Sequence, residues 1–131
     1  MAIRHTVLDP EGLTRPAPYA HVVVAQPGRL IFCAGQVAED EHGAIVGAGD
    51  MRAQTLQALR NLGRALAAAG ATYDDLVKLT WFVTDMARIA ELRDARVEVL
   101  GDRRLASTLV EVRTLYRPEL LVEVEAMAVV Q

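Results

Sequence analysis

Hydrophobic and polar positions follow two different periods along this chain, and together they predict a sheet covered by two helices. An apolar, β-rich run at 29–34 and an alternating segment at 76–84 are typical of strands, and two more strands are expected near 107–114 and 120–130. Between these strands, apolar residues recur every three or four positions in two segments, 51–69 and 86–100. This order predicts one sheet with both helices packed on one face, an α+β or α/β sandwich.

The ends of both predicted helices carry the usual signals. Asp50 precedes the first helix as an N-cap and Gly70 follows it, whereas Asp85 or Thr84 precedes the second helix and Gly101 follows it. The apolar stripe of the first helix consists of Leu56, Leu59, Leu62, Leu66 and Ala69. The looser stripe of the second helix consists of Ile89, Leu92, Val97 and Leu100. We expect both stripes to face the sheet.

The last predicted strand has two very different faces. Alternation places on one face the small apolar residues Val122, Val124, Ala126, Ala128 and Val130, which belong under the helices. It places on the other face Leu121, Glu123, Glu125, Met127 and Val129. Two carboxylates among large apolar groups suit neither open water nor a sealed core. A second subunit would cover such a face, so we predict a symmetric homo-oligomer with sites at its interfaces.

Chain length and charge limit the class of protein. The 131 residues are enough for one domain, 1–131, with its own core. The net charge is −3 and the isoelectric point about 5.6, with only three Tyr, two Phe and one Trp, so a nucleic-acid partner is not expected. No apolar run approaches the ~20 residues of a membrane span, and no apolar segment follows the N-terminal Arg and His. We therefore expect no membrane partner and a cytoplasmic location.

Few side chains have the spacing of a metal or nucleophile site. Cys33 is the only cysteine, and in an apolar strand we expect it to pack as a small hydrophobic residue. His5 and His42 lie in segments without a periodic pattern, where we expect a flexible chain. No two His or carboxylates on one element have metal-ligand spacing. The sequence therefore indicates no metal and no other cofactor.

From Pro18 to Val130 the chain resembles the Rid family, also called YjgF, which is named after the reactive intermediate deaminase RidA. The matching segments occur in the family's order and spacing: PYAH at 18–21, CAGQVA at 33–38, VGAGDMRAQTLQALRNLGRALAAAGAT at 46–72, VKLTWFVTDM at 77–86, ASTLVEV at 106–112 and LVEVEAMAVV at 121–130. Residues 1–17 lie outside the clear resemblance.

This resemblance implies both a fold and a chemistry. The fold is a chorismate-mutase-like α+β fold with one mixed sheet and two helices on one face, assembled as a homotrimer with clefts between neighbouring subunits. The best-known members hydrolyse enamines and imines to 2-keto acids and ammonia. Such a site needs a positive group for the substrate carboxylate, a polarised water for the imine carbon and donors for the nitrogen.

The resemblance also implies which residues line the cleft. Glu125 is at the position of the family's water-orienting Glu, and Tyr19 and Gly35 are at two other cleft-lining positions. Deaminase members have an Arg that binds the substrate carboxylate at the position where this chain has Ser107. Because a serine hydroxyl carries no charge, we do not expect efficient deamination of 2-imino acids. Ser107 and Thr108 are expected to hydrogen-bond the substrate instead.

Another arginine could replace the missing charge, and four candidates lie near Ser107 in the sequence: Arg93, Arg96, Arg103 and Arg104. Arg93 lies between Ile89 and Val97 at helical spacing, at the edge of the apolar stripe, and is the substrate-binding candidate among them. The alternative for each of the four is an ordinary solvated or ion-paired arginine.

Three functions remain open at this point. The first is a Rid-like hydrolase of an enamine, an imine or a related C–N compound, in which Glu125 places the water. The second is a small-molecule-binding or regulatory trimer without catalysis. The third, an endoribonuclease or translation inhibitor, is disfavoured by the acidic isoelectric point and the few aromatic residues.

Overall fold

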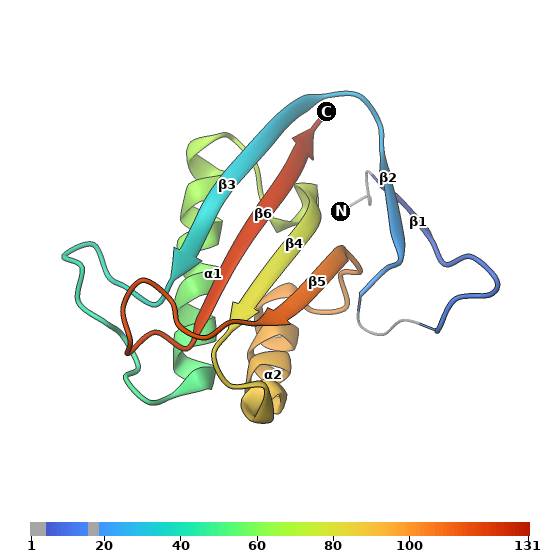
Figure 1. Cartoon of the computed structure of the whole chain (residues 1–131). Helices are drawn as coiled ribbons and strands as arrows, with labels where there is room; N and C mark the ends of the chain where they lie inside the picture. Colours follow the sequence, from blue (N-terminus) through green and yellow to red (C-terminus); the bar gives the residue numbers. More distant parts are fainter. Residues whose placement is uncertain (1–4, 16–18) are drawn as a thin grey trace.

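The computed structural model describes residues 5–15 and 19–131, and its centre is a four-stranded sheet. The strand order is β3 (Arg29–Val37), β6 (Val122–Val130), β4 (Leu76–Val83) and β5 (Ala106–Glu111) (Figure 1). The β4–β5 pair is parallel, and the β3–β6 and β4–β6 pairs are antiparallel. The sheet is therefore mixed, and the four strands agree with those expected from the sequence.

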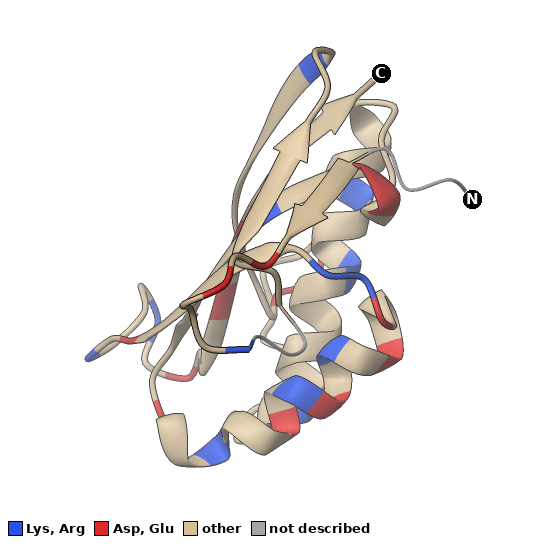
Figure 2. Ribbon diagram, turned by 90° about the vertical axis from the view of Figure 1, so that its right-hand side faces the viewer, with Lys and Arg blue, Asp and Glu red and all other residues tan. Residues whose placement is uncertain are grey.

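Two helices cover one face of this sheet, which confirms the predicted α+β arrangement. The helices are α1 (Met51–Ala68) and α2 (Ile89–Leu100), and two short 3₁₀ turns, η1 (Tyr73–Asp75) and η2 (Met86–Arg88), precede β4 and α2. Figure 2 shows both helices on the same side of the strands. Oδ1 of Asp50 caps α1 by accepting from the Ala53 amide at 3.0 Å, as its position predicts.

The core lies between the helices and the face of the sheet that they cover. Its largest members are fully buried: Met51, Leu59, Leu62, Leu66, Leu76, Leu79, Trp81, Val83, Leu100, Leu120 and Val122. The even-numbered residues of β6 from Val122 to Ala128 face this core, as alternation predicts. Cys33 packs against the core, and burial raises the pKa of its thiol.

The opposite face of the sheet carries no helix within the described residues, and it is called here the open face.

Two positions of the expected helix stripes are wrong. Leu56 is only half-buried, because the stripe of α1 that meets the sheet runs through Met51, Thr55 and Ala58 instead. Thr55 tolerates full burial since its hydroxyl donates to the Met51 carbonyl at 2.8 Å. Val97 is 55% exposed, because α2 turns Arg96 inward in its place.

An N-terminal hairpin was not expected from the sequence. Strands β1 (His5–Leu8) and β2 (Val22–Ala25) form a separate antiparallel pair beside the sheet (Figure 1). His5 is therefore in a strand, not in a flexible segment, and its Nε2 lies 3.2 Å from the Asp75 carbonyl. Pro18 of the matching Pro-Tyr-Ala-His segment, together with residues 1–4 and 16–17, lies outside the described residues.

The segment after β2 joins the hairpin to the edge of the sheet. The Ala20 amide donates to the Leu105 carbonyl at 2.9 Å, and Ala20 forms a parallel bridge with Ala106, the first residue of β5. Tyr19 and His21 are thereby held beside the start of β5. Within the described ranges, 5–15 and 19–131, no helix is long and apolar enough to cross a membrane.

Candidate functional site

A pocket of about 390 Å³ lies between the edge strand β5 and helix α2. Its lining residues come from the N-terminal segment, β4, α2 and β5: Tyr19, His21, Trp81, Ile89, Leu92, Arg93, Arg96, Ser107, Thr108 and Leu109. Four of the residues predicted from the sequence to bind substrate, Tyr19, Arg93, Ser107 and Thr108, are therefore brought together in one place. Two others, Gly35 and Glu125, are not among its lining residues.

One face of α2 forms a wall of the pocket. The α2 residues that line it are three and four positions apart, which places them on one side of a helix: Ile89, Leu92, Arg93 and Arg96. Arg93 is exposed and Arg96 is buried. The same wall thus carries one guanidinium at the solvent side and one toward the core.

The N-terminal segment forms the opposite wall. Tyr19 and His21 contact each other edge to face, with ring centroids 5.6 Å apart. The Tyr19 carbonyl accepts from Nη2 of Arg104 at 3.2 Å, and Nε2 of His21 is bonded to the Thr14 carbonyl. The first bond fixes the Tyr19 backbone, and the second fixes the His21 ring, against which the Tyr19 ring packs.

Ser107 and Thr108 point to opposite faces of the sheet. Ser107 is paired with Leu79, whose side chain is in the core, so Ser107 faces the helix side and the pocket. Thr108 is paired with Thr80 and lies on the open face, where its Oγ1 accepts from Nζ of Lys78 at 2.7 Å. Thr108 therefore reaches only the rim of the pocket.

Gly35 and the two carboxylates of β6 lie together on the open face. Glu125 is paired with Thr80 and is exposed, whereas Glu123 is half-buried beside Gly35. A Cβ added to Gly35 would overlap the Glu123 carboxylate, so a larger residue at this position would require the end of the Glu123 side chain to move. Burial, and then the nearby charge of Glu125, raise the pKa of Glu123. The carboxylate that shares a site with Gly35 is thus Glu123.

Arg96 is the least expected member of the pocket wall. The side chain is 4% exposed, and its recorded bond runs from Nη2 to the Arg103 carbonyl at 3.2 Å. Its Nη1 is buried and has no hydrogen-bond partner among the residues that the structure describes, and burial lowers the pKa of the guanidinium. The sequence pattern placed Val97 on the buried stripe, but Arg96 is buried in its place, while Leu92 and Leu100 are buried as expected.

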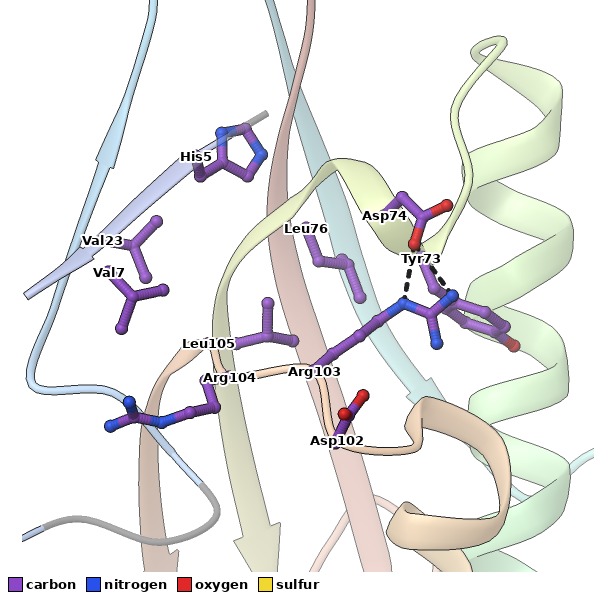
Figure 3. Close-up of a pocket in the computed structure, with 10 residues that line it drawn as sticks. All are labelled: His5, Val7, Val23, Tyr73, Asp74, Leu76, Asp102, Arg103, Arg104 and Leu105. Carbon is purple, nitrogen blue, oxygen red and sulfur yellow. Dashed lines mark hydrogen bonds and ion pairs between the residues drawn. The ribbon is translucent and has the colours of Figure 1, made fainter. Parts of the chain in front are cut away.

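The remaining candidate arginines are engaged elsewhere. Arg103 and Arg104 line a second pocket of about 480 Å³, which lies between the β1–β2 hairpin and the start of β4 (Figure 3). Nε of Arg103 donates to Asp74 at 2.9 Å, and Arg104 pairs with Asp9. In Figure 3 the two guanidiniums point away from each other. Neither lines the pocket that contains Ser107.

Comparison with known proteins gives consistent matches over almost the whole chain. The family described as Endoribonuclease L-PSP matches residues 12–130. A RutC family protein of Pyrococcus horikoshii is 33% identical over 123 residues, which are 93% of this chain and 95% of the relative. The crystal structure of YyfB from Yersinia pestis, a Rid family protein of unknown function, is 36% identical with a TM-score of 0.88, covering 97% of this chain and 99% of that chain.

A more distant solved structure has the same fold. A YjgF family member from Mycobacterium tuberculosis is 36% identical, with a TM-score of 0.68, over 87% of this chain and 88% of that chain. The family match at residues 12–130 spans both helices and all four strands of the sheet.

Proposed function

The chain belongs to the Rid family, and from this premise we propose that it is a cytoplasmic hydrolase of enamines, imines or related C–N compounds. The observation that carries the proposal is the pocket between β5 and α2, which is lined by Tyr19 and Ser107, the residues at two cleft positions implied by the family resemblance. The apolar walls from Trp81, Ile89 and Leu92 would exclude bulk water from a small substrate.

The proposal includes a homotrimer, because one chain holds only half of the expected cleft. Tyr19 and Ser107 line the pocket at the sheet edge, whereas Gly35 and the β6 carboxylates are on the open face. β4 separates β6 from β5, so the strands that carry the carboxylates and Ser107 are about 10 Å apart within one chain, and β3 with Gly35 is one strand further away. A neighbouring subunit that brings its open face to this edge would complete the cleft.

The proposed chemistry is hydrolysis by a water molecule held by a carboxylate. The water oxygen attacks the imine carbon while the carboxylate takes its proton, and the electron pair of the C=N bond moves to nitrogen. The carboxylic acid then returns the proton to nitrogen, which gives a carbinolamine. The carboxylate next takes the hydroxyl proton of the carbinolamine and passes it to nitrogen, the C–N bond breaks, and the carbonyl product and ammonia leave. We keep Glu125 as the predicted carboxylate and add Glu123, which its contact with Gly35 favours.

The proposal is tested with two imines that differ in charge. The purified protein is mixed with 2-iminopropionate or with butan-2-imine, each generated in situ, and release of the carbonyl product is followed. We expect acceleration of at least one reaction, and a loss of about 100-fold or more when the responsible carboxylate is changed, in Glu123→Gln or in Glu125→Gln. Arg64→Met, an exposed change on α1, serves as the control. No acceleration of either imine would contradict the hydrolase.

A second prediction concerns the missing charge on β5. Ser107→Arg places a guanidinium where the deaminase members of the family have one. We expect this variant to hydrolyse 2-iminopropionate about tenfold faster or more, with no gain on butan-2-imine, because only the former carries a carboxylate. A Ser107→Arg variant that is no faster than the unmodified chain would contradict the importance assigned to this charge.

A binding or regulatory trimer without catalysis is the second candidate, and the uncharged Ser107 is the observation that favours it. This second candidate predicts that a small molecule binds saturably and that no carbonyl product is released from either imine. Endoribonuclease activity, which appears in the description of the matching family, is the weakest candidate because the net charge is −3.

A further inference from the structure

Arg96 carries a positive charge inside the protein that no described residue neutralises. Its guanidinium makes one recorded hydrogen bond, to a backbone carbonyl, and Nη1 has none. A buried charge without an opposite charge costs folding free energy. Charged side chains whose pKa is strongly shifted by burial are common at functional sites. Arg96 is such a side chain and lines a pocket, which makes this pocket a candidate binding site.

The pocket concentrates positive charge. Arg93 and Arg96 are three residues apart on α2, so their side chains lie on one face of the helix and line one volume. None of the described residues that line this pocket is acidic. The apolar neighbours Trp81 and Leu92 are 2% and 3% exposed, and this poorly hydrated wall strengthens the attraction of the buried Arg96 guanidinium for an anion.

We propose that this pocket binds small molecules through a carboxylate or similar anionic group, which is held by Arg96 and Arg93 of α2. The inference rests on the proposed function and deepens it. In the deaminase members the arginine that binds the substrate carboxylate is at the position of Ser107 on β5, whereas here the binding arginines are on α2. Nη1 of Arg96 is covered by protein atoms, so the guanidinium turns toward the pocket as the anion enters. That turn gives up only the bond to the Arg103 carbonyl.

A purely structural Arg96 makes the opposite prediction for stability. If its role is to anchor the segment at Arg103, then Arg96→Met removes a useful hydrogen bond and lowers the melting temperature. If its charge is retained for a ligand, Arg96→Met removes an uncompensated buried charge and raises the melting temperature of the free protein. The same substitution then removes stabilisation by anions.

The only tryptophan gives a direct binding signal. Trp81 lines the pocket, and the sequence contains no other Trp. The emission of the full-length protein is titrated with 2-oxobutanoate and, as the uncharged comparison, with butanone, which has the same four-carbon ketone skeleton. The variants are Arg96→Met, Arg96→Lys and Arg93→Met, with Arg64→Met as a control that removes one charge outside the pocket.

We expect a saturable emission change with 2-oxobutanoate and not with butanone. Arg96→Met should weaken the affinity for 2-oxobutanoate by about ten- to hundredfold, and Arg93→Met should weaken it by a smaller factor. Arg64→Met should leave this affinity unchanged. Arg96→Lys keeps a positive charge and should still bind 2-oxobutanoate more tightly than butanone. Unchanged affinity in Arg96→Met, or equal binding of both ligands by the unmodified chain, would overturn the inference. If Arg96→Met does not fold, unchanged affinity in Arg93→Met overturns it.

This binding test is independent of the hydrolase test. Charge-dependent binding without imine hydrolysis would contradict the hydrolase and support the anion site. Hydrolysis of imines together with charge-independent binding would support the hydrolase and overturn the anion site.

Discussion

At the scale of single residues, the contact between Gly35 and Glu123 is the most restrictive feature of the open face. The glycine leaves the space that the carboxylate occupies, and the carboxylate is half-buried as a result. Burial and the charge of Glu125 both raise the pKa of Glu123. Glu123 is therefore easier to protonate than a free glutamate, which suits a group that has to take up and return a proton.

This raised pKa leads to a pH prediction for Glu123→Gln. A carboxyl group with a raised folded-state pKa favours the fold when protonated, and that contribution is lost as pH rises through the folded-state pKa. Glu123→Gln should therefore raise the melting temperature at pH 7, with the gain disappearing below about pH 4, where a free Glu is itself protonated. Thermal unfolding at both pH values, with the exposed Glu11→Gln as control, measures this. A gain that is equal at both pH values would contradict the electrostatic origin.

At the scale of secondary-structure elements, a buried amide ties α1 to the start of β6. Gln54 is fully buried, and its Nε2 donates to the carbonyls of Glu119 at 2.9 Å and of Gly47 at 3.2 Å. Its Oε1 accepts from the Leu121 amide at 2.8 Å. One side chain thus satisfies three backbone groups that the loops before α1 and β6 would otherwise bury unpaired.

The loss of this amide should be costly. Gln54→Leu keeps the approximate volume but leaves buried backbone groups unsatisfied, so we expect a loss of about 2–4 kcal/mol in the free energy of unfolding. Gln57→Leu is the matched control, since Gln57 bonds only to the side chains of Arg60 and Asn61 and should change stability far less. Urea unfolding measures both variants. Equal losses would contradict the role given to Gln54.

At the scale of the whole molecule, the open face has the composition of a subunit interface. Phe32 is 69% exposed and is paired with Met127, and Leu30 is also exposed on the same face. Large apolar residues grouped on an uncovered sheet are costly in water. The proposed homotrimer would bury them and bring one chain's open face to the next chain's pocket.

The assembly is tested by mass in solution. We expect a particle with three times the 14.3 kDa of the chain, and Phe32→Asp should shift it to smaller species because it places a charge in the proposed interface. Leu13→Asp, an equally drastic change at an exposed loop position, should leave the mass unchanged. A monomeric unmodified chain would contradict both the homotrimer and the cleft between subunits.

The sequence by itself determined the four strands of the sheet, both helices and the two faces of β6. These features depend on local periodicity and on caps such as Asp50, which act within a few residues of the chain. Four residues that the sequence resemblance proposed for substrate binding, Tyr19, Arg93, Ser107 and Thr108, line one pocket, and their role in binding stays a prediction. The β1–β2 hairpin was missed because its strands are only four residues long and are stabilised by pairing across a long connection.

Only the tertiary structure decided which arginine lies in the pocket wall and which carboxylate meets Gly35. Whether Arg96 or Val97 is the buried residue of α2 depends on how the helix packs against its neighbours, and the loose apolar stripe did not fix it. The Gly35–Glu123 contact depends on the register across a bulge in β3. Register and helix rotation are set by packing between distant segments, which no local pattern records.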